Sequence, residues 1–150
     1  MSKTLAKNRR ATFDYEFIKK YEAGLALKGL EVKSIKDGHG SLKGSFVSIY
    51  KDELYLTNAN IPPYKFAGNP KNYDPLASRK LLLHKKEIKY LLGKSKTEGL
   101  TMVPLSLYTS KNKVKLKFAL ARGKKKYDKR ETLKKRSAQR EIDRKLKSRF

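Results

Sequence analysis

The side chains in this chain that could carry out covalent or metal chemistry are few and scattered. The 150 residues include no cysteine and only two histidines, His39 and His84, neither with a carboxylate at metal-ligand spacing. The glycine-rich stretch 38–44 (GHGSLKG) lacks the strand and helix that frame a phosphate-binding P-loop. No Ser/His/Asp set or carboxylate pair stands out. We therefore predict a protein that is not an enzyme and uses no metal or other cofactor.

Lysine and arginine are abundant enough to define the chemistry of the surface instead. The chain has 38 of them against 14 acidic residues, a net charge of +24. This charge destabilises a compact state by self-repulsion unless a polyanion is present. Nucleic acid is the first candidate for that polyanion and an anionic membrane surface is the second. Cations interspersed with tyrosine and phenylalanine fit phosphate contacts combined with base stacking.

Two features in the first 123 residues could contact a nucleic acid. In 113–120 (KVKLKFAL), apolar residues alternate with Lys113, Lys115 and Lys117, so the lysines should line the outer face of a strand. These lysines could bind phosphates, or they could be solvated edge residues that oppose aggregation. Glu22 could accept hydrogen bonds from a nucleobase, or it could be a cap or turn carboxylate.

The C-terminal segment 124–150 is the most cationic part of the chain, with 13 lysines and arginines against 4 acidic residues. In a helix, Glu131–Lys135 and Glu141–Lys145 would be favourable pairs four residues apart. The apolar residues are too few to form a buried face. We expect the segment to be disordered alone and helical when a polyanion neutralises it. The alternative is a solvated segment that only keeps the protein soluble.

The elements that must position these residues are short strands and helices. The patterns predict a helix over 14–24, strands over 24–35, a hairpin over 45–61 about 51–53, a helix over 77–93, and a hairpin formed by 100–110 and 113–120. Short strands with exposed edges aggregate, so a small closed barrel of five or six strands is the economical arrangement. Residues 1–12 are predicted to be a flexible basic arm. No apolar run approaches the roughly 20 residues of a membrane span, and we expect a soluble, cytoplasmic protein.

Three stretches of the chain resemble one protein family. YEAGLALKGLEVKSI (21–35), DPLASRKLLLHKKEI (74–88) and GKKKYDKRE (123–131) strongly resemble the SsrA-binding protein family, also called small protein B. Residues 59–75 and 100–108 fit the same pattern in the same order. The resemblance implies an oligonucleotide-binding-fold-like, six-stranded closed barrel with three helices over 13–123, followed by a basic tail over 124–150.

The resemblance also implies a function in bacterial trans-translation. The barrel would bind the tRNA-like domain of transfer-messenger RNA and deliver that RNA to stalled ribosomes. The tail would enter the empty mRNA channel beyond the 16S rRNA decoding centre and become helical there. No membrane and no small-molecule substrate are implied as partners.

The functional residues of the family are carried over at the matching positions. Those for transfer-messenger RNA are Tyr15, Glu22, Lys33, Arg79, Lys80, Leu82, His84, Lys124 and Lys125. Those for the decoding centre and for accommodation of the RNA on the ribosome are Tyr127, Asp128, Lys129, Arg130, Lys134, Lys135, Arg136 and Arg140. The chain departs from the family at two positions. Phe13 stands where many members have histidine, and Ala77 stands where arginine is usual.

Two rival functions use the same composition. A ribosomal protein, held permanently by rRNA through its barrel and tail, is the alternative from another class of binding protein. Its presence on every ribosome, rather than on stalled ones, would identify it by co-sedimentation. An RNA-modifying enzyme is the third interpretation, and it lacks a catalytic constellation in the sequence.

Overall fold

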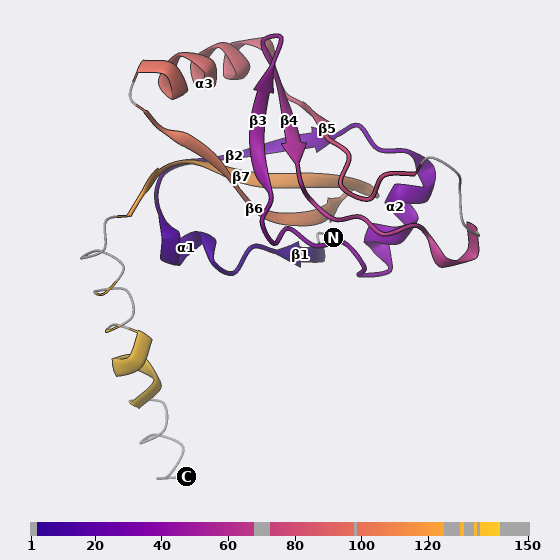
Figure 1. Cartoon of the computed structure of the whole chain (residues 1–150), viewed down its shortest axis with the longest axis horizontal. Coiled ribbons are helices and arrows are strands. Elements are labelled where there is room, and N and C mark those ends of the chain that lie inside the picture. The colour runs from indigo at the N-terminus through magenta and orange to yellow at the C-terminus, as the bar shows by residue number, and fades with distance from the viewer. Residues whose placement is uncertain are drawn as a thin grey trace.

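The computed structural model describes residues 3–67, 73–97, 99–124, 130, 134 and 136–141. Their fold is an antiparallel sheet with short helices at its ends and edges (Figure 1). The elements in chain order are β1 (Lys3–Lys7), α1 (Ala11–Asp14), β2 (Tyr15–Leu25), α2 (Gly29–Lys36), β3 (Phe46–Tyr50), β4 (Glu53–Thr57), the 3₁₀ turn η1 (Lys65–Ala67), β5 (Arg79–Leu82), α3 (Lys85–Thr97), β6 (Thr101–Ser110) and β7 (Lys113–Gly123).

The sheet is bent but open. Its seven described strands follow the order β1-β6-β7-β2-β5-β4-β3. The β3–β4 hairpin crosses the long strands in Figure 1, and β3 lies against β6, so the sheet curves around its core. Among the described strands, however, β1 and β3 are edges with a pairing partner on one side only. The prediction of a six-stranded closed barrel is therefore not confirmed.

Both predicted hairpins are confirmed. β3 pairs with β4 and β6 pairs with β7, each around a two-residue turn. The turn residues Lys51, Asp52, Lys111 and Asn112 all have positive φ, as the right-handed twist of a tight hairpin requires. In β7, Val114, Leu116, Phe118 and Leu120 are buried while Lys113 is exposed, which confirms the predicted alternation.

The helix predicted over 14–24 and the strands predicted over 24–35 are wrong, because the structure has the reverse order. Residues 15–25 form β2, and a bulge between Phe17 and Lys19 adds one residue to that strand. The bulge leaves Ile18 49% exposed, although its spacing from Tyr21 imitates a helical face. Residues 29–36 form α2, whose buried residues are Glu31, Ser34 and Ile35. Two of these three buried residues are polar. The apolar residues of α2 therefore do not recur with the period of a helix, and the sequence pattern does not indicate one.

Two further predicted elements are partly wrong. The helix predicted over 77–93 is a short strand, β5, followed by α3. Residues 3–7, predicted to belong to a free arm, form β1, which pairs antiparallel with β6. The N-terminal segment therefore extends the sheet and contributes to the surface that the long strands present.

The turn of the first hairpin offers a test of local strain. We expect Asp52→Gly to raise the free energy of unfolding by roughly 0.5–1 kcal/mol, because Asp52 has a φ of 60° and glycine adopts that conformation without steric cost. Urea unfolding of the full chain would measure the change. Asp37→Gly is the matched control, since Asp37 has a φ of −77°. Equal changes in the two variants would contradict the strain argument.

Candidate nucleic-acid interface

Four of the residues proposed to bind RNA lie around one open groove. Glu22 belongs to β2, Lys80 and Leu82 to β5, and His84 directly precedes α3. The register that pairs Gly24 with Leu82 brings these two strands together. The groove has a volume of about 560 Å³, and Lys115 of β7 also lines it. Segments far apart in the sequence thus contribute carboxylates, an imidazole, an exposed leucine and lysines to a common surface.

The outward-facing lysines of β7 extend this surface across the sheet. Lys117 lies opposite Glu22 on β2, and Lys115 lies opposite Gly24 on β2 and Tyr108 on β6. The Lys117 ammonium is 5.7 Å from the centre of the Tyr108 ring. The face therefore presents cations next to an aromatic ring, a combination that suits phosphates and bases. Tyr108 was missed in the sequence, although the register of its hairpin places it beside the lysines.

Glu22 keeps its capacity to accept hydrogen bonds. The Tyr108 hydroxyl is buried and has no hydrogen-bond partner of good geometry among the described residues. Burial, and then the nearby Glu22 carboxylate, raise the pKa of Tyr108 to about 12. We interpret this as proximity of the negative charge rather than as a formed hydrogen bond, since the geometry of a bond is lacking. The Glu22 side chain is exposed, so its carboxylate oxygens can also accept from a ligand.

Lys80 is an exposed cation that already has a partner. Its ammonium lies 2.9 Å from a Glu53 carboxylate oxygen of β4, with 45% of the Lys80 side chain accessible. The bond to Glu53 raises the pKa of Lys80, so the lysine stays charged. An exposed pair of this kind stabilises little and exchanges readily for another anion. Lys80 is therefore accessible to a phosphate at the price of releasing Glu53.

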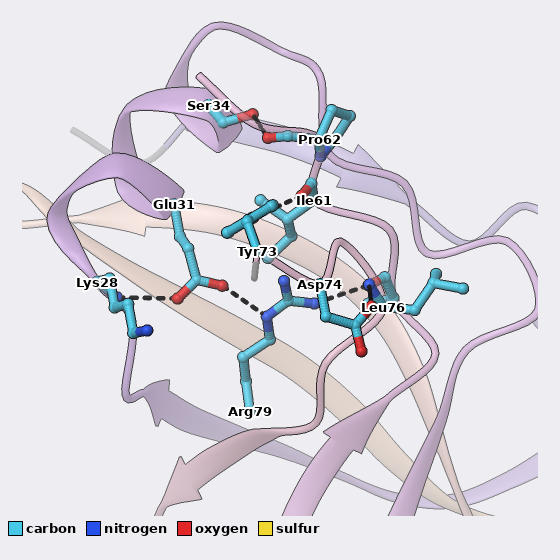
Figure 2. Close-up of polar contacts among 10 residues, drawn as sticks. Lys28, Glu31, Ser34, Ile61, Pro62, Tyr73, Asp74, Leu76 and Arg79 are labelled. Carbon is cyan, nitrogen blue, oxygen red and sulfur yellow. Dashed lines mark hydrogen bonds and ion pairs between the residues drawn. The ribbon is translucent and has the colours of Figure 1, made fainter. Parts of the chain in front are cut away.

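Arg79, which is predicted to bind RNA, is buried in the structure. The side chain is 3% exposed, and its Nε donates to Glu31 Oε2 at 2.8 Å (Figure 2). Its Nη1 donates to the Ala59 carbonyl at 2.8 Å. Glu31 also accepts from the Lys28 backbone N–H at 3.0 Å. In this position Arg79 presents no cation at the surface, and its role in RNA binding stays a prediction. Arg79 joins β5 to the first turn of α2.

The same region holds described parts of the connection between β4 and β5. The Ser34 hydroxyl donates to the Pro62 carbonyl and the Tyr73 hydroxyl donates to the Ile61 carbonyl, both at 2.6 Å (Figure 2). The Ser34 bond ties α2 to this connection, and the Arg79–Glu31 pair ties α2 to β5. The interior polar cluster thus positions the end of β2 and the start of β5, on which the groove depends.

Three further predicted RNA-binding residues, all within the described part of the chain, lie away from the groove. Tyr15 begins β2 at the opposite end from Gly24, where it packs near Ala11 and Val103. Lys124 lies at the same end, with its backbone N–H bonded to the Asp14 carbonyl and its ammonium to the Thr12 carbonyl, each at 2.9 Å. Lys33, exposed on α2, lies 5.7 Å from the centre of the Tyr64 ring. The structure therefore brings together four of the predicted residues and separates three.

Four of the eight predicted ribosome-binding residues fall outside the described part of the chain. These are Tyr127, Asp128, Lys129 and Lys135, together with the RNA-binding candidate Lys125. Arg130, Lys134, Arg136 and Arg140 are described and exposed, and residues 136–141 are helical. Arg136 donates from Nη2 to Thr12 Oγ1 at 2.9 Å, next to the Lys124 contact. The predicted change from disorder to helix is not tested by these contacts and stays a prediction.

Other kinds of site find no support in the described residues. No group of three or more His, Cys, Asp or Glu side chains in that part of the chain is arranged to hold a metal ion. None of the helices described is long and apolar enough to cross a membrane. What the fold and the groove define is a class: a cationic β-sheet protein with lysines, an exposed carboxylate and aromatic rings on one face.

Comparison with known proteins identifies the family. The model of the SmpB protein family matches residues 5–148, and the chain belongs to this family. An SsrA-binding protein from Carboxydothermus hydrogenoformans is 51% identical over 150 residues, with 100% of both chains covered. Another from Geobacillus kaustophilus is 50% identical over 147 residues, which cover 98% of this chain and 94% of the relative.

A solved structure agrees with this assignment. It is described as "tmRNA-SmpB: a journey to the center of the bacterial ribosome" and has 47% sequence identity with this chain. The TM-score is 0.65, and the superposition covers 85% of this chain and 92% of the other. At 47% identity the two chains are similar in sequence as well as in their β-sheet fold.

Proposed function

We propose that this protein binds the tRNA-like domain of transfer-messenger RNA and delivers that RNA to stalled ribosomes for trans-translation. It acts as a binding protein rather than as an enzyme, and it works in the cytoplasm, where ribosomes translate. Membership of the SmpB family and the likeness to a tmRNA–SmpB structure support this proposal. The observation that carries it is the groove in which Glu22, Lys80, Leu82 and His84 meet beside the β7 lysines.

The groove has features that a basic patch alone does not need. RNA loops with unstacked bases are recognised by stacking, by hydrogen bonds to base edges and by contacts to the backbone. The Glu22 carboxylate supplies an acceptor for a base edge, Leu82 supplies an apolar surface that is 52% exposed, and the lysines supply phosphate contacts. We propose that the bent open sheet uses this face as an oligonucleotide-binding fold uses its own.

The tail, in this proposal, detects that the mRNA channel is empty. A segment of high positive charge orders where rRNA phosphates neutralise it, and mRNA in the channel excludes it sterically and electrostatically. We propose that 13–123 bind the RNA and that 124–150 act on the ribosome, with Tyr127 stacking on a decoding-centre base. Lys124 is the junction, because it is bonded to Thr12 and Asp14 at the end of the sheet.

The Glu22 carboxylate offers a test in which specific and non-specific binding change in opposite directions. Removing a negative charge strengthens non-specific attraction to RNA, whereas removing a base-edge acceptor weakens specific binding. We expect Glu22→Ala to weaken binding to transfer-messenger RNA about tenfold at physiological salt and to leave binding to an elongator tRNA unchanged or slightly tighter. Fluorescence titrations at several salt concentrations would measure both affinities.

Glu16→Ala is the matched control for this titration, because Glu16 is an exposed glutamate near the far end of the same strand. It should retain the full preference for transfer-messenger RNA. If the wild-type protein binds both RNAs alike and releases both with the same salt dependence, the proposed function is wrong. Binding to every ribosome in stoichiometric amounts would then favour a permanent ribosomal protein.

A further inference from the structure

A second hollow lies between β2 and α3, next to the groove. Its walls are Lys19, Lys20 and Tyr21 of β2 and Lys86, Glu87 and Tyr90 of α3, and its volume is about 460 Å³. Glu22 lines both this hollow and the groove, so the two are contiguous. We call it the α3 hollow. A volume of this size lies within the range of small-ligand sites and accommodates one nucleotide.

The hollow exists because β2 has a free edge. β2 pairs with β7 along nearly its whole length, but it pairs with β5 only at Gly24 and Leu25. No other described strand adjoins residues 19–22 on that side. The first turns of α3 come close to this edge, as their shared hollow with β2 shows. The edge is therefore partly covered by side chains, and the space between strand and helix stays open.

Tyr21 lines this space and has a buried hydroxyl without a partner among the described residues. The residue is 6% exposed and its ring stacks on Phe118 in the core, with ring centres 5.6 Å apart. Burial, and then the nearby Tyr90 and Glu87, raise the pKa of Tyr21, so the hydroxyl stays protonated. Buried polar groups are nearly always bonded, and an orphaned one in the wall of a hollow indicates a missing acceptor.

Cations and one exposed ring surround this donor. The Lys19 ammonium lies 5.2 Å from the centre of the Tyr21 ring and 5.6 Å from that of Tyr90. Tyr90 is 48% exposed, so part of its ring is available for stacking. Lys19, Lys20 and Lys86 form no ion pair with the described residues. Three lysines thus outnumber the carboxylates of Glu22 and Glu87, which can accept from the amino groups of a base.

We propose that the α3 hollow binds one unstacked nucleotide of the RNA held in the groove, an inference that rests on the proposed function. The base stacks on Tyr90, the Tyr21 hydroxyl donates to an acceptor on the base or sugar, and the backbone phosphates lie against Lys19, Lys20 and Lys86. The hollow thereby extends recognition from β2 onto α3. It would let the protein read an unpaired position that a regular RNA helix cannot present.

Fluorescence gives a direct test, because the chain contains no tryptophan. In Tyr90→Trp the only indole lies in the α3 hollow. We expect transfer-messenger RNA to quench its emission, and the midpoint of the quenching to equal the midpoint of RNA binding. Phe66→Trp is the control, since Phe66 is exposed and has the Lys65 ammonium 4.8 Å from its ring centre, but it lies in η1, outside the walls of the hollow. Its emission should not follow binding. Quenching of Tyr90→Trp by a free mononucleotide at micromolar concentration would overturn the proposal in favour of a small-molecule site.

Two substitutions test the hollow by removing a group from it, without introducing a fluorophore. Tyr90→Ala should weaken binding to transfer-messenger RNA about tenfold, within the range for loss of one base–aromatic stack, while Phe66→Ala should not. Tyr21→Phe removes only the hydroxyl. We expect it to weaken RNA binding several-fold and to leave the melting temperature of the free protein equal or higher, because an unpaired buried hydroxyl is lost.

The outcomes separate this inference from the function on which it rests. If the wild-type protein shows no preference for transfer-messenger RNA over tRNA, the proposed function fails and the hollow fails with it. If the preference is present and the Tyr90 and Tyr21 variants bind as the wild type does, only the hollow is refuted. A lower melting temperature for free Tyr21→Phe also refutes it, because the hydroxyl would then have a partner inside the protein.

Discussion

Replacing Arg79 by alanine is expected to lower the free energy of unfolding by about 3–5 kcal/mol, the usual cost of removing one partner from a buried ion pair. Glu31 is 7% exposed, and without Arg79 its carboxylate loses the partner 2.8 Å away that compensates its charge. The Ala59 carbonyl loses its donor at the same time. The loss would exceed that of most single substitutions, and urea unfolding of the full chain would measure it.

Lys80→Ala is the matched control in the same strand, because its ion pair with Glu53 is exposed and should contribute about 1 kcal/mol or less. The double variant Arg79→Met with Glu31→Gln should recover at least half of the loss. The glutamine removes the uncompensated charge and keeps an oxygen for the Lys28 backbone N–H. If Arg79→Ala leaves the stability unchanged and weakens RNA binding, Arg79 binds RNA, and its proposed structural role as the buried partner of Glu31 is wrong.

The Arg79–Glu31 pair also explains where sequence patterns failed. Glu31 is a buried residue of α2 and Arg79 is a buried residue of β5, so each element hides a charged side chain where an apolar one is expected. Periodicity of apolar residues could not find either element. The bulge at Phe17 and Lys19 disguised β2 in a different way, by shifting its alternation. By contrast, the two hairpins have uninterrupted strands and turn residues that tolerate positive φ, and both were predictable.

Four residues of the candidate groove were named from the sequence, but the strand pairing that brings them together was not predicted. The family motifs identified Glu22, Lys80, Leu82 and His84 in the sequence, and the apolar alternation of β7 identified its outward-facing lysines. The Gly24–Leu82 register that unites them depends on pairing between segments distant in the sequence. Tyr21 and Tyr90 have no local signal at all, since one resembles a core tyrosine and the other a helix-surface residue. Their chemistry becomes apparent only when β2 and α3 are placed side by side.

Removing the tail should separate RNA binding from ribosome rescue. We expect the chain truncated after Lys124 to bind transfer-messenger RNA with an affinity within about threefold of the full protein at physiological salt. The same truncation should abolish the tagging of stalled products. The cut belongs after Lys124 because Gly123 pairs with Tyr15 in the sheet and Lys124 is bonded to Thr12 and Asp14. Truncation after Arg122 would remove those contacts and confuse instability with loss of function.

The measurement combines an RNA titration with a reconstituted tagging reaction on ribosomes stalled with empty or mRNA-filled channels. Without residues 125–150 the chain loses 12 of its lysines and arginines, so its low-salt affinity should fall even if specific binding is intact. The comparison must therefore be made as a function of salt. A tail of the same composition in scrambled order, placed after Lys124, is the matched control for charge alone. If the scrambled tail restores tagging, charge alone is sufficient and the proposed roles of Tyr127 and of Asp128–Arg130 are wrong. If it restores only the low-salt affinity, the order of residues in the tail is what the empty channel recognises.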